Sequence, residues 1–197
     1  MNVEVKSSSG ITLSDVESRM LTSRRLFIAG KIDDQKACDF FQEILLLNQQ
    51  SSSLPIDVMI DSDGGMINAG MLMYDAIQTS KAPVRTFCIG RACSMGAVLA
   101  VCGPAGRYIL PHSKIVIHEP VVEDNISGGS STIKTLSEKL IEEKKKLCEI
   151  YVKHTGRTAQ EVEQVMSCTH IFDAKESITF GLADEIIGIG RILGDEV

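Results

Sequence analysis

The sequence predicts an α/β domain built on a largely parallel sheet, and three observations support this prediction. Strand-like runs at 25–30, 56–60 and 84–90 alternate with helical patterns, which is typical of parallel strands joined by crossover helices. Small and polar residues follow these strands, at the ends where such sheets bind ligands. A length of 197 residues suits a single domain with a substantial core.

The N-terminal half divides into a polar segment, a strand and a helix. Residues 1–14 are polar and Ser-rich, so we expect a flexible N-terminal segment and a single domain over 15–197. After the strand at 25–30, Asp33 or Asp34 is a suitable cap for a helix that runs to about Asn48. The expected inner face of this helix consists of Ala37, Phe40, Phe41, Ile44 and either Leu45 or Leu47.

The central elements follow a loop at 51–55. The strand at 56–60 is expected to break at the turn 61–65, and a helix begins near Ile67, with apolar residues at spacings of three and four. The strand at 84–90 leads through a serine turn into a small-residue helix over 95–101. Two further strands are predicted at 107–110 and 114–118.

A long helical pattern over 132–154 follows a polar segment at 121–131. About 23 residues at ~1.5 Å each give a helix of roughly 35 Å, which is long for a domain of this size. We expect this arm to pack on a partner subunit, and the alternative is a solvated amphipathic helix. The arm and the segment before it define a handle region at about 121–155.

The C-terminal part predicts two short helices. Thr155-Gly156 is a stop signal for the long helix, and a short helix is expected over 158–166. Asp173 and Glu176 have the spacing of a capping box that opens another helix, ended by Gly181.

Composition excludes several classes of function. The net charge is −6, Trp is absent and aromatic residues make up 5%, which argues against a nucleic-acid binder. No apolar run reaches the roughly 18 residues of a membrane span, and residues 1–10 have no signal core, so a cytoplasmic protein is expected. The six cysteines form no CxxC pair, and we expect reduced thiols and no metal or cofactor.

Ser94 is the most informative residue of the chain. It lies in Cys93-Ser94-Met95-Gly96, between the strand at 84–90 and the following helix, so its hydroxyl is presented at a sharp turn. A helix N-terminus provides free N–H groups that favour negative charge. His118 ends another strand 24 positions later (118 − 94). A nucleophile, a base and an anion site are the components of acyl-transfer chemistry.

These residues belong to segments that resemble a known family. The segments 90–97 and 110–120 resemble the two active-site blocks of the ClpP family, the proteolytic subunits of the ATP-dependent Clp protease. Further similarity lies at 15–21, 61–65, 70–75 and 180–184, and the resemblance spans about 15–190 in order.

The resemblance implies a crotonase-like ClpP fold of repeated ββα units with a protruding handle helix. It implies heptameric rings stacked into a double ring, with unfolded protein as substrate and an AAA+ unfoldase partner that uses the ATP, so that the subunit itself needs no cofactor. Ser94 would be the nucleophile and His118 the general base. The N–H groups of Gly65 and Met95 would form the oxyanion hole.

The third member of the triad departs from the family. Thr169 stands where the family has an aspartate. Three readings remain open. Thr169 Oγ accepts the His118 Nδ1–H bond, Asp173 substitutes for the missing carboxylate, or His118 has no orienting group. Loss of this acid costs ~10⁴ in rate in serine proteases.

Other departures affect the turn, the substrate strand and the docking cleft. Asp63 replaces a proline beside the anion site, where a carboxylate disfavours an oxyanion. Residues 121–124 differ from the family's Gly-rich substrate strand. Asp57 and Met59 stand where tyrosines often line the cleft that docks the unfoldase. We expect altered docking, and for Asp57 the alternative is ordinary surface variation.

The other three histidines, His112, His154 and His170, are expected to be structural or solvated. His154 ends the handle helix, where a cation suits the helix dipole.

Three functions follow from the sequence. The leading one is a ClpP-like serine endopeptidase with weakened intrinsic activity. The second is a non-catalytic subunit that forms mixed rings with an active ClpP paralogue. The third is a crotonase-type acyl-CoA enzyme, since that fold also uses Gly-rich oxyanion turns, although nothing in the sequence argues for CoA recognition.

Overall fold

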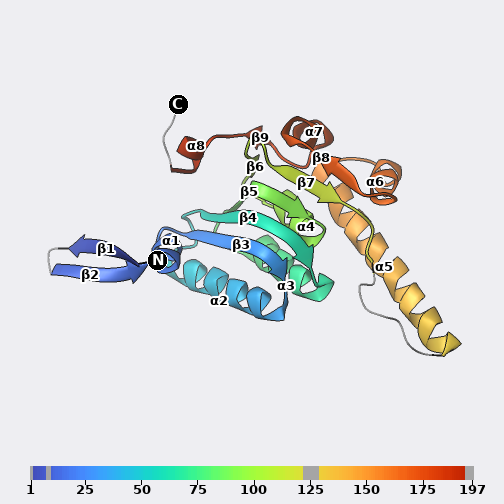
Figure 1. The fold of residues 1–197 in the computed structure, drawn as a ribbon, viewed down its shortest axis with the longest axis horizontal. Coiled ribbons are helices and arrows are strands. Elements are labelled where there is room, and N and C mark those ends of the chain that lie inside the picture. Colours follow the sequence, from blue (N-terminus) through green and yellow to red (C-terminus); the bar gives the residue numbers. More distant parts are fainter. Residues whose placement is uncertain (1, 8–9, 122–128, 194–197) are drawn as a thin grey trace.

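The computed structural model describes residues 2–7, 10–121 and 129–193, and its centre is a parallel sheet (Figure 1). Strands β3 (Arg25–Ile32), β4 (Ile56–Gly65) and β5 (Val84–Cys93) pair in parallel, and β6 (Arg107–Ile109) and β9 (Glu185–Ile186) extend the sheet in the order β3-β4-β5-β6-β9. The predicted α/β class is confirmed. The break expected at 61–65 is wrong, because β4 continues to Gly65 with a shift in register after Ile60.

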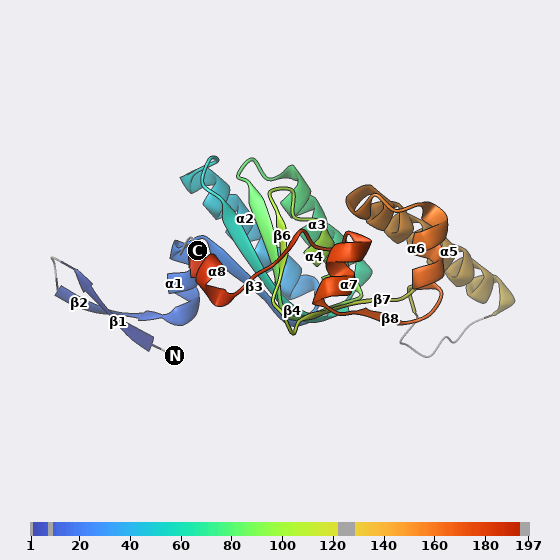
Figure 2. The ribbon, with the colours of Figure 1, turned by 90° about the horizontal axis from the view of Figure 1, so that it is seen from above.

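Strand β5 is long enough to pair with two different strands on the same side. Its first half pairs with β6, and its second half pairs with β7 (Lys114–Ile117). Strand β8 (His170–Phe172) adds to β7 in the antiparallel sense. Figure 2 shows β7 and β8 side by side between α7 and α6. The carboxyl end of β7 is thereby brought to the carboxyl end of β5.

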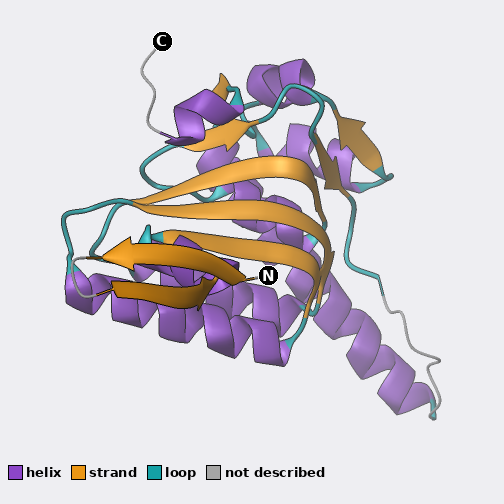
Figure 3. Ribbon diagram, turned by 60° about the vertical axis from the view of Figure 1, so that its left-hand side comes forward, coloured by secondary structure: helices purple, strands orange, loops and turns teal. Residues whose placement is uncertain are grey.

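Helices α2 (Asp34–Gln50), α3 (Ile67–Thr79) and α4 (Met95–Val101) pack against the central strands (Figure 3). Asp33 is the N-cap of α2 and accepts from the N–H of Lys36 at 2.9 Å. Of the two leucines proposed for its inner face, Leu47 is buried and Leu45 is exposed, so Leu47 is the one on the inner face. Helix α4 is buried along its whole length and carries the candidate nucleophile at its start.

Helix α5 (Ser130–Thr155) projects from the body of the domain (Figure 1), as predicted for 132–154. Its C-terminal half is anchored by Leu147, Cys148, Ile150 and Tyr151, which are buried. Gly156 ends the helix in the left-handed conformation, with φ 70°. Of the predicted handle region, residues 122–128 lie outside the described part of the chain.

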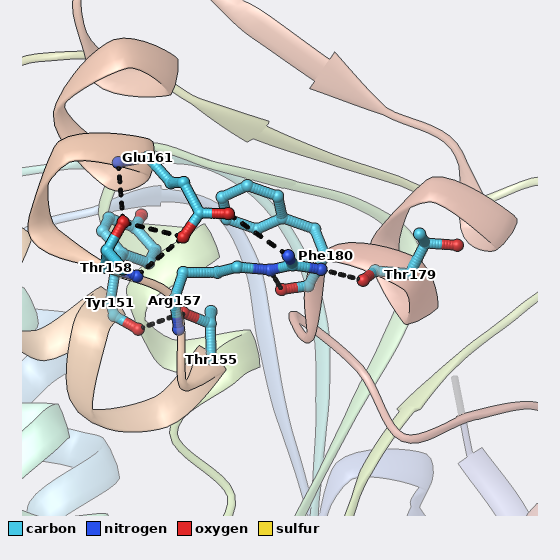
Figure 4. Close-up of polar contacts among 7 residues, drawn as sticks. All are labelled: Tyr151, Thr155, Arg157, Thr158, Glu161, Thr179 and Phe180. Atoms are coloured by element: carbon cyan, nitrogen blue, oxygen red, sulfur yellow. Dashed lines mark hydrogen bonds and ion pairs between the residues drawn. The ribbon is translucent and has the colours of Figure 1, made fainter.

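Helices α6 (Ala159–Met166) and α7 (Ala174–Phe180) flank β8 and begin with complete capping boxes. Arg157 joins them (Figure 4). Its guanidinium donates to the carbonyls of Thr179 and Phe180, the latter at 3.0 Å, and its Nη1 lies 3.3 Å from Glu161 Oε1. This contact holds the two helix ends on either side of the segment that carries Thr169.

The N-terminal region has regular structure that the sequence did not predict. Strands β1 (Asn2–Ser7) and β2 (Gly10–Asp15) form an antiparallel hairpin that projects beyond the sheet (Figure 1). Helix α1 (Val16–Thr22) joins the hairpin to β3. Helix α8 (Ile189–Leu193) lies near the C-terminus. None of the helices in the described residues is long and apolar enough to cross a membrane.

Candidate active site

Ser94 occupies a strained turn between β5 and α4. Its backbone has φ 54° and ψ −121°, and within the described residues only one other non-glycine residue, Arg24, has positive φ. Such a conformation costs about 1–3 kcal/mol and persists where the surrounding structure enforces it. The Ser94 N–H donates to the carbonyl of Val116 in β7 at 2.9 Å. This bond joins the serine turn to the strand that leads to His118.

The glycine turn at the end of β4 packs directly on Ser94. A Cβ at Gly64, which has φ 87°, would lie 2.7 Å from Ser94 Cβ and 2.6 Å from the Cys93 carbonyl oxygen. A Cβ at Gly65 would lie 2.1 Å from the carbonyl oxygen of Ile32. The absence of side chains at both positions is therefore a steric requirement.

A buried hydroxyl supports this turn. Ser62 is fully buried, donates to the carbonyl of Gly30 at 2.6 Å and accepts from the N–H of Gly64 at 3.0 Å. Sequence reasoning did not single out Ser62, and the only signal was its place beside the two glycines.

Met95 provides a backbone donor next to the nucleophile. It is the first residue of α4, where an N–H has no partner inside the helix. Its side chain is buried against Gly70 of α3, where a Cβ would lie 2.4 Å from Met95 Cε. The side chain of the residue that follows Ser94 is therefore held by packing against α3.

One cavity contains the four residues predicted as nucleophile, base and oxyanion donors. Ser94, His118, Gly65 and Met95 all line a cavity of about 430 Å³. The remaining lining is mixed: it includes apolar residues of α5 such as Leu140 and Leu147, while Lys31, Asp63, Lys139 and Glu143 add charge. The fold thus gathers residues from four separate chain segments around Ser94.

His118 has an orienting contact that the sequence did not predict. Its Nδ1 lies 2.6 Å from the carbonyl oxygen of Glu119. A carbonyl oxygen can only accept, so Nδ1 carries the proton and the neutral ring has its lone pair on Nε2. This is the tautomer that a general base acting through Nε2 requires.

Thr169 lies next in register to His118 but outside the cavity. In the β7–β8 pairing Ile117 lies opposite His170, so the next pair in this register would be His118 and Thr169. Thr169 is exposed and does not line the cavity, and within the described residues its hydroxyl makes no hydrogen bond. The reading in which Thr169 Oγ accepts from Nδ1 therefore disagrees with the observed contact to Glu119.

Asp173 is committed to a structural role. Its carboxylate accepts from the N–H of Glu176 at 2.8 Å, and the Glu176 carboxylate accepts from the N–H of Asp173 at 2.9 Å. In the register of β7 and β8 it lies beyond Phe172, whose partner is Ile115, at the end of the ladder far from His118. The predicted capping box is confirmed, and substitution for the triad acid by Asp173 is contradicted.

Asp63 is paired at the rim of the cavity. Its carboxylate lies 2.7 Å from Nη2 of Arg91, and both side chains are more than half exposed. An ion pair of this exposure contributes about 0–1 kcal/mol to stability. Arg91 nevertheless offsets part of the repulsion that we expected Asp63 to exert on an oxyanion.

The remaining histidines lie outside the cavity. His112 and His170 are exposed. His154 Nε2 lies 2.9 Å from the hydroxyl of Tyr74. Burial, with smaller effects of Lys153 and Arg107, lowers the pKa of His154 to about 4. The imidazole is therefore neutral near pH 7, and the cation in the last turn of α5 is Lys153 rather than His154.

Asp57 and Met59, which stand at the family's docking-cleft positions, are both buried. Asp57 is buried and accepts from Nε and Nη2 of Arg85 at 2.6 Å and 2.9 Å, so the reading of Asp57 as surface variation is wrong. It lines a pocket of about 240 Å³ together with Phe87 and Tyr108. Met59 is buried in a small cluster with Phe87 and Ile187.

The chain matches the model of a known protein family. The family model described as Clp protease matches residues 8–190. The match covers most of the chain and begins earlier than the resemblance at about 15 indicated.

Proposed function

This chain belongs to the Clp protease family, and we propose that it is a serine endopeptidase that hydrolyses peptide bonds of unfolded proteins inside an oligomeric chamber. The observation that supports this function best is the single cavity that contains Ser94, His118, Gly65 and Met95. Strain at Ser94 is expected where a nucleophile must be presented at a strand-to-helix turn.

The proposed reaction proceeds through an acyl-enzyme. Ser94 Oγ attacks the carbonyl carbon of the scissile bond while its proton passes to His118 Nε2. The carbonyl oxygen becomes an oxyanion that accepts from the N–H groups of Met95 and Gly65. Collapse breaks the C–N bond, and the proton on Nε2 leaves with the amine. Water, deprotonated by His118, then releases the acyl group and restores Ser94.

The intrinsic rate of this proposed enzyme is low. Within the described residues His118 makes no hydrogen bond to a carboxylate, because Thr169 stands at the family's acid position and Asp173 is used as a cap. Removal of the acid in serine proteases lowers the rate by ~10⁴ and leaves the contribution of the oxyanion hole.

The substrate and assembly follow from surfaces around the cavity. The apolar part of its lining, which includes Met66, Leu140 and Leu147, suits a peptide with an apolar side chain next to the scissile bond. On α5, Ile133, Leu136 and Ile141 are exposed, which supports packing of this helix against other subunits in heptameric rings, stacked in pairs. The rings would contain copies of this chain or a ClpP paralogue, located in the cytoplasm.

We further propose that ATP is used by a partner unfoldase and that this subunit holds no cofactor of its own. Asp57 and Arg85 make the pocket near Phe87 charged. An unfoldase that docks at this pocket would therefore need a surface different from one that fits an aromatic cleft.

A second candidate function is a non-catalytic subunit of a mixed ring. The position of Thr169 favours it, since this residue is exposed and, within the described residues, makes no hydrogen bond to His118. Treatment of the assembled protein with a serine-reactive fluorophosphonate distinguishes the two functions. Adduct on Ser94 that is absent in Ser94→Ala supports the peptidase. No adduct, with this chain alone or mixed with a conventional subunit, would exclude it.

A further inference from the structure

The orienting group of His118 can be identified from the residues that surround its Nδ1. The acceptor at 2.6 Å is the backbone carbonyl of Glu119, and this carbonyl has the role that a carboxylate has in the usual triad. It selects the Nε2 base tautomer and fixes the ring plane, but it supplies no negative charge.

The Glu119 carbonyl is restrained on its C-terminal side by Pro120. A residue before proline is confined to extended conformations, because the proline ring clashes with its backbone in the helical region. Pro120 is itself buried and lines the cavity. The peptide unit that contains the Glu119 carbonyl therefore has little freedom to rotate.

The Glu119 side chain provides a second restraint. Its carboxylate lies 2.6 Å from Nζ of Lys144 in α5. Lys144 stands one turn before Leu147 and Cys148, two of the buried residues that anchor α5 to the domain. The cation is thus held by a part of the helix that packs on the core.

Lys144 is the first of three consecutive lysines, and its Nζ is the one that pairs with the Glu119 carboxylate. Lys144 is half-buried, whereas Lys145 and Lys146 are exposed. Lys145 therefore provides a matched control, because it has the same charge and lies at the next position of the same helix.

We propose that Glu119 and Lys144 are positioning residues for His118. The ion pair between their side chains holds the Glu119 carbonyl against His118 Nδ1. This inference rests on the proposed peptidase function. During acylation the Ser94 proton goes to Nε2, the Nδ1–H bond to Glu119 is kept throughout, and the Nε2 proton leaves with the amine. The handle helix thereby contributes to the orientation of the catalytic base through a single side chain.

The test compares the rate at which a fluorophosphonate acylates Ser94 in variants of the full chain with equal size in solution. Lys144→Met, which keeps most of the side-chain stem, should lower this rate about three- to fivefold, as expected for a partly exposed ion pair. Lys144→Arg should retain the rate, and Lys145→Met should not change it. Glu119→Gln and the double variant Glu119→Gln/Lys144→Met should show the same loss as Lys144→Met, since all three remove one pair.

With a peptide substrate, Lys144→Met should lower kcat and leave KM unchanged, because the pair orients the base and does not bind substrate. An unchanged acylation rate in Lys144→Met, or an equal loss in Lys145→Met, would overturn the positioning role while leaving the peptidase proposal intact. Failure of the unsubstituted protein to react at Ser94 would instead overturn the peptidase proposal, and this inference with it.

Discussion

Gly64 and Ser94 are packed so closely that a Cβ at position 64 would lie 2.7 Å from Ser94 Cβ. The end of β4 and the start of α4 thus form one rigid unit, in which the oxyanion turn and the nucleophile cannot move independently. Gly64 also has φ 87°, a conformation that side chains disfavour.

Gly64→Ala should therefore lower both stability and reactivity. We expect a loss of about 1–3 kcal/mol in the free energy of unfolding and loss of fluorophosphonate labelling at Ser94. The control is Gly188→Ala, since a Cβ there has no neighbour within 4 Å. Equal labelling of Gly64→Ala and the unsubstituted protein would show that the close packing of Gly64 on Ser94 is not needed for reactivity.

Thr169→Asp should raise the acylation rate. Thr169 is the residue next in register to His118, and a carboxylate there would stabilise the imidazolium that forms during the reaction. Such an acid contributes ~10⁴-fold to the rate in serine proteases, so recovery of even part of this factor would raise the acylation rate tenfold or more. Thr169→Asn, which adds similar bulk without charge, should stay near the original rate. If the aspartate variant is no faster, the missing acid does not limit this enzyme.

Asp173→Ala should reduce stability without affecting the chemistry. Asp173 caps α7 through the N–H of Glu176, and loss of such a cap costs about 1 kcal/mol. Denaturant unfolding measures the loss, and the labelling rate of Ser94 measured far from the unfolding transition should be unchanged. A selective fall in labelling would restore Asp173 as a member of the catalytic group.

The half-buried imidazole of His154 should make the fold less stable at mildly acidic pH. Burial holds the pKa of His154 at about 4 in the folded protein, against an ordinary 6.5. Between these values the unfolded chain binds a proton that the folded protein does not, so stability falls as pH decreases from about 6.5 to about 4. Melting temperatures at pH 7 and pH 5 should differ less in His154→Gln than in the unsubstituted protein. His112→Gln, at an exposed position, serves as the control and should leave the difference unchanged.

The apolar surface of α5 should control assembly. Ile141 is 65% exposed on the projecting helix, and Ile141→Glu places a charge where the proposed subunit contact would bury a side chain. Light scattering should show a smaller particle for Ile141→Glu than for Leu54→Glu, which is a matched change at another exposed residue. Identical masses for the two variants would argue that this face of α5 has no partner.

The sequence by itself determined the order of the central strands and helices and singled out four of the residues that line the cavity. Helix α2 could be predicted because its cap, Asp33, and its buried face have strict spacing, and the capping box at Asp173 was equally local. Ser94 and His118 were recognisable because each ends a strand, and parallel strands bring their carboxyl ends to one edge. The hairpin β1–β2 was not predicted, because the alternation of Val3 and Val5, and of Ile11 and Leu13, with polar residues is short and lies in a polar, Ser-rich segment.

Only the tertiary structure decided what surrounds these residues. The contact of His118 with the Glu119 carbonyl depends on a backbone direction, and the pair of Glu119 with Lys144 joins residues 25 positions apart. The neutral state of His154 depends on burial beside Tyr74, which no local pattern around position 154 indicates. Chemistry at a single position follows from residue type, whereas hydrogen-bond partners and protonation depend on neighbours that the folded chain alone brings together.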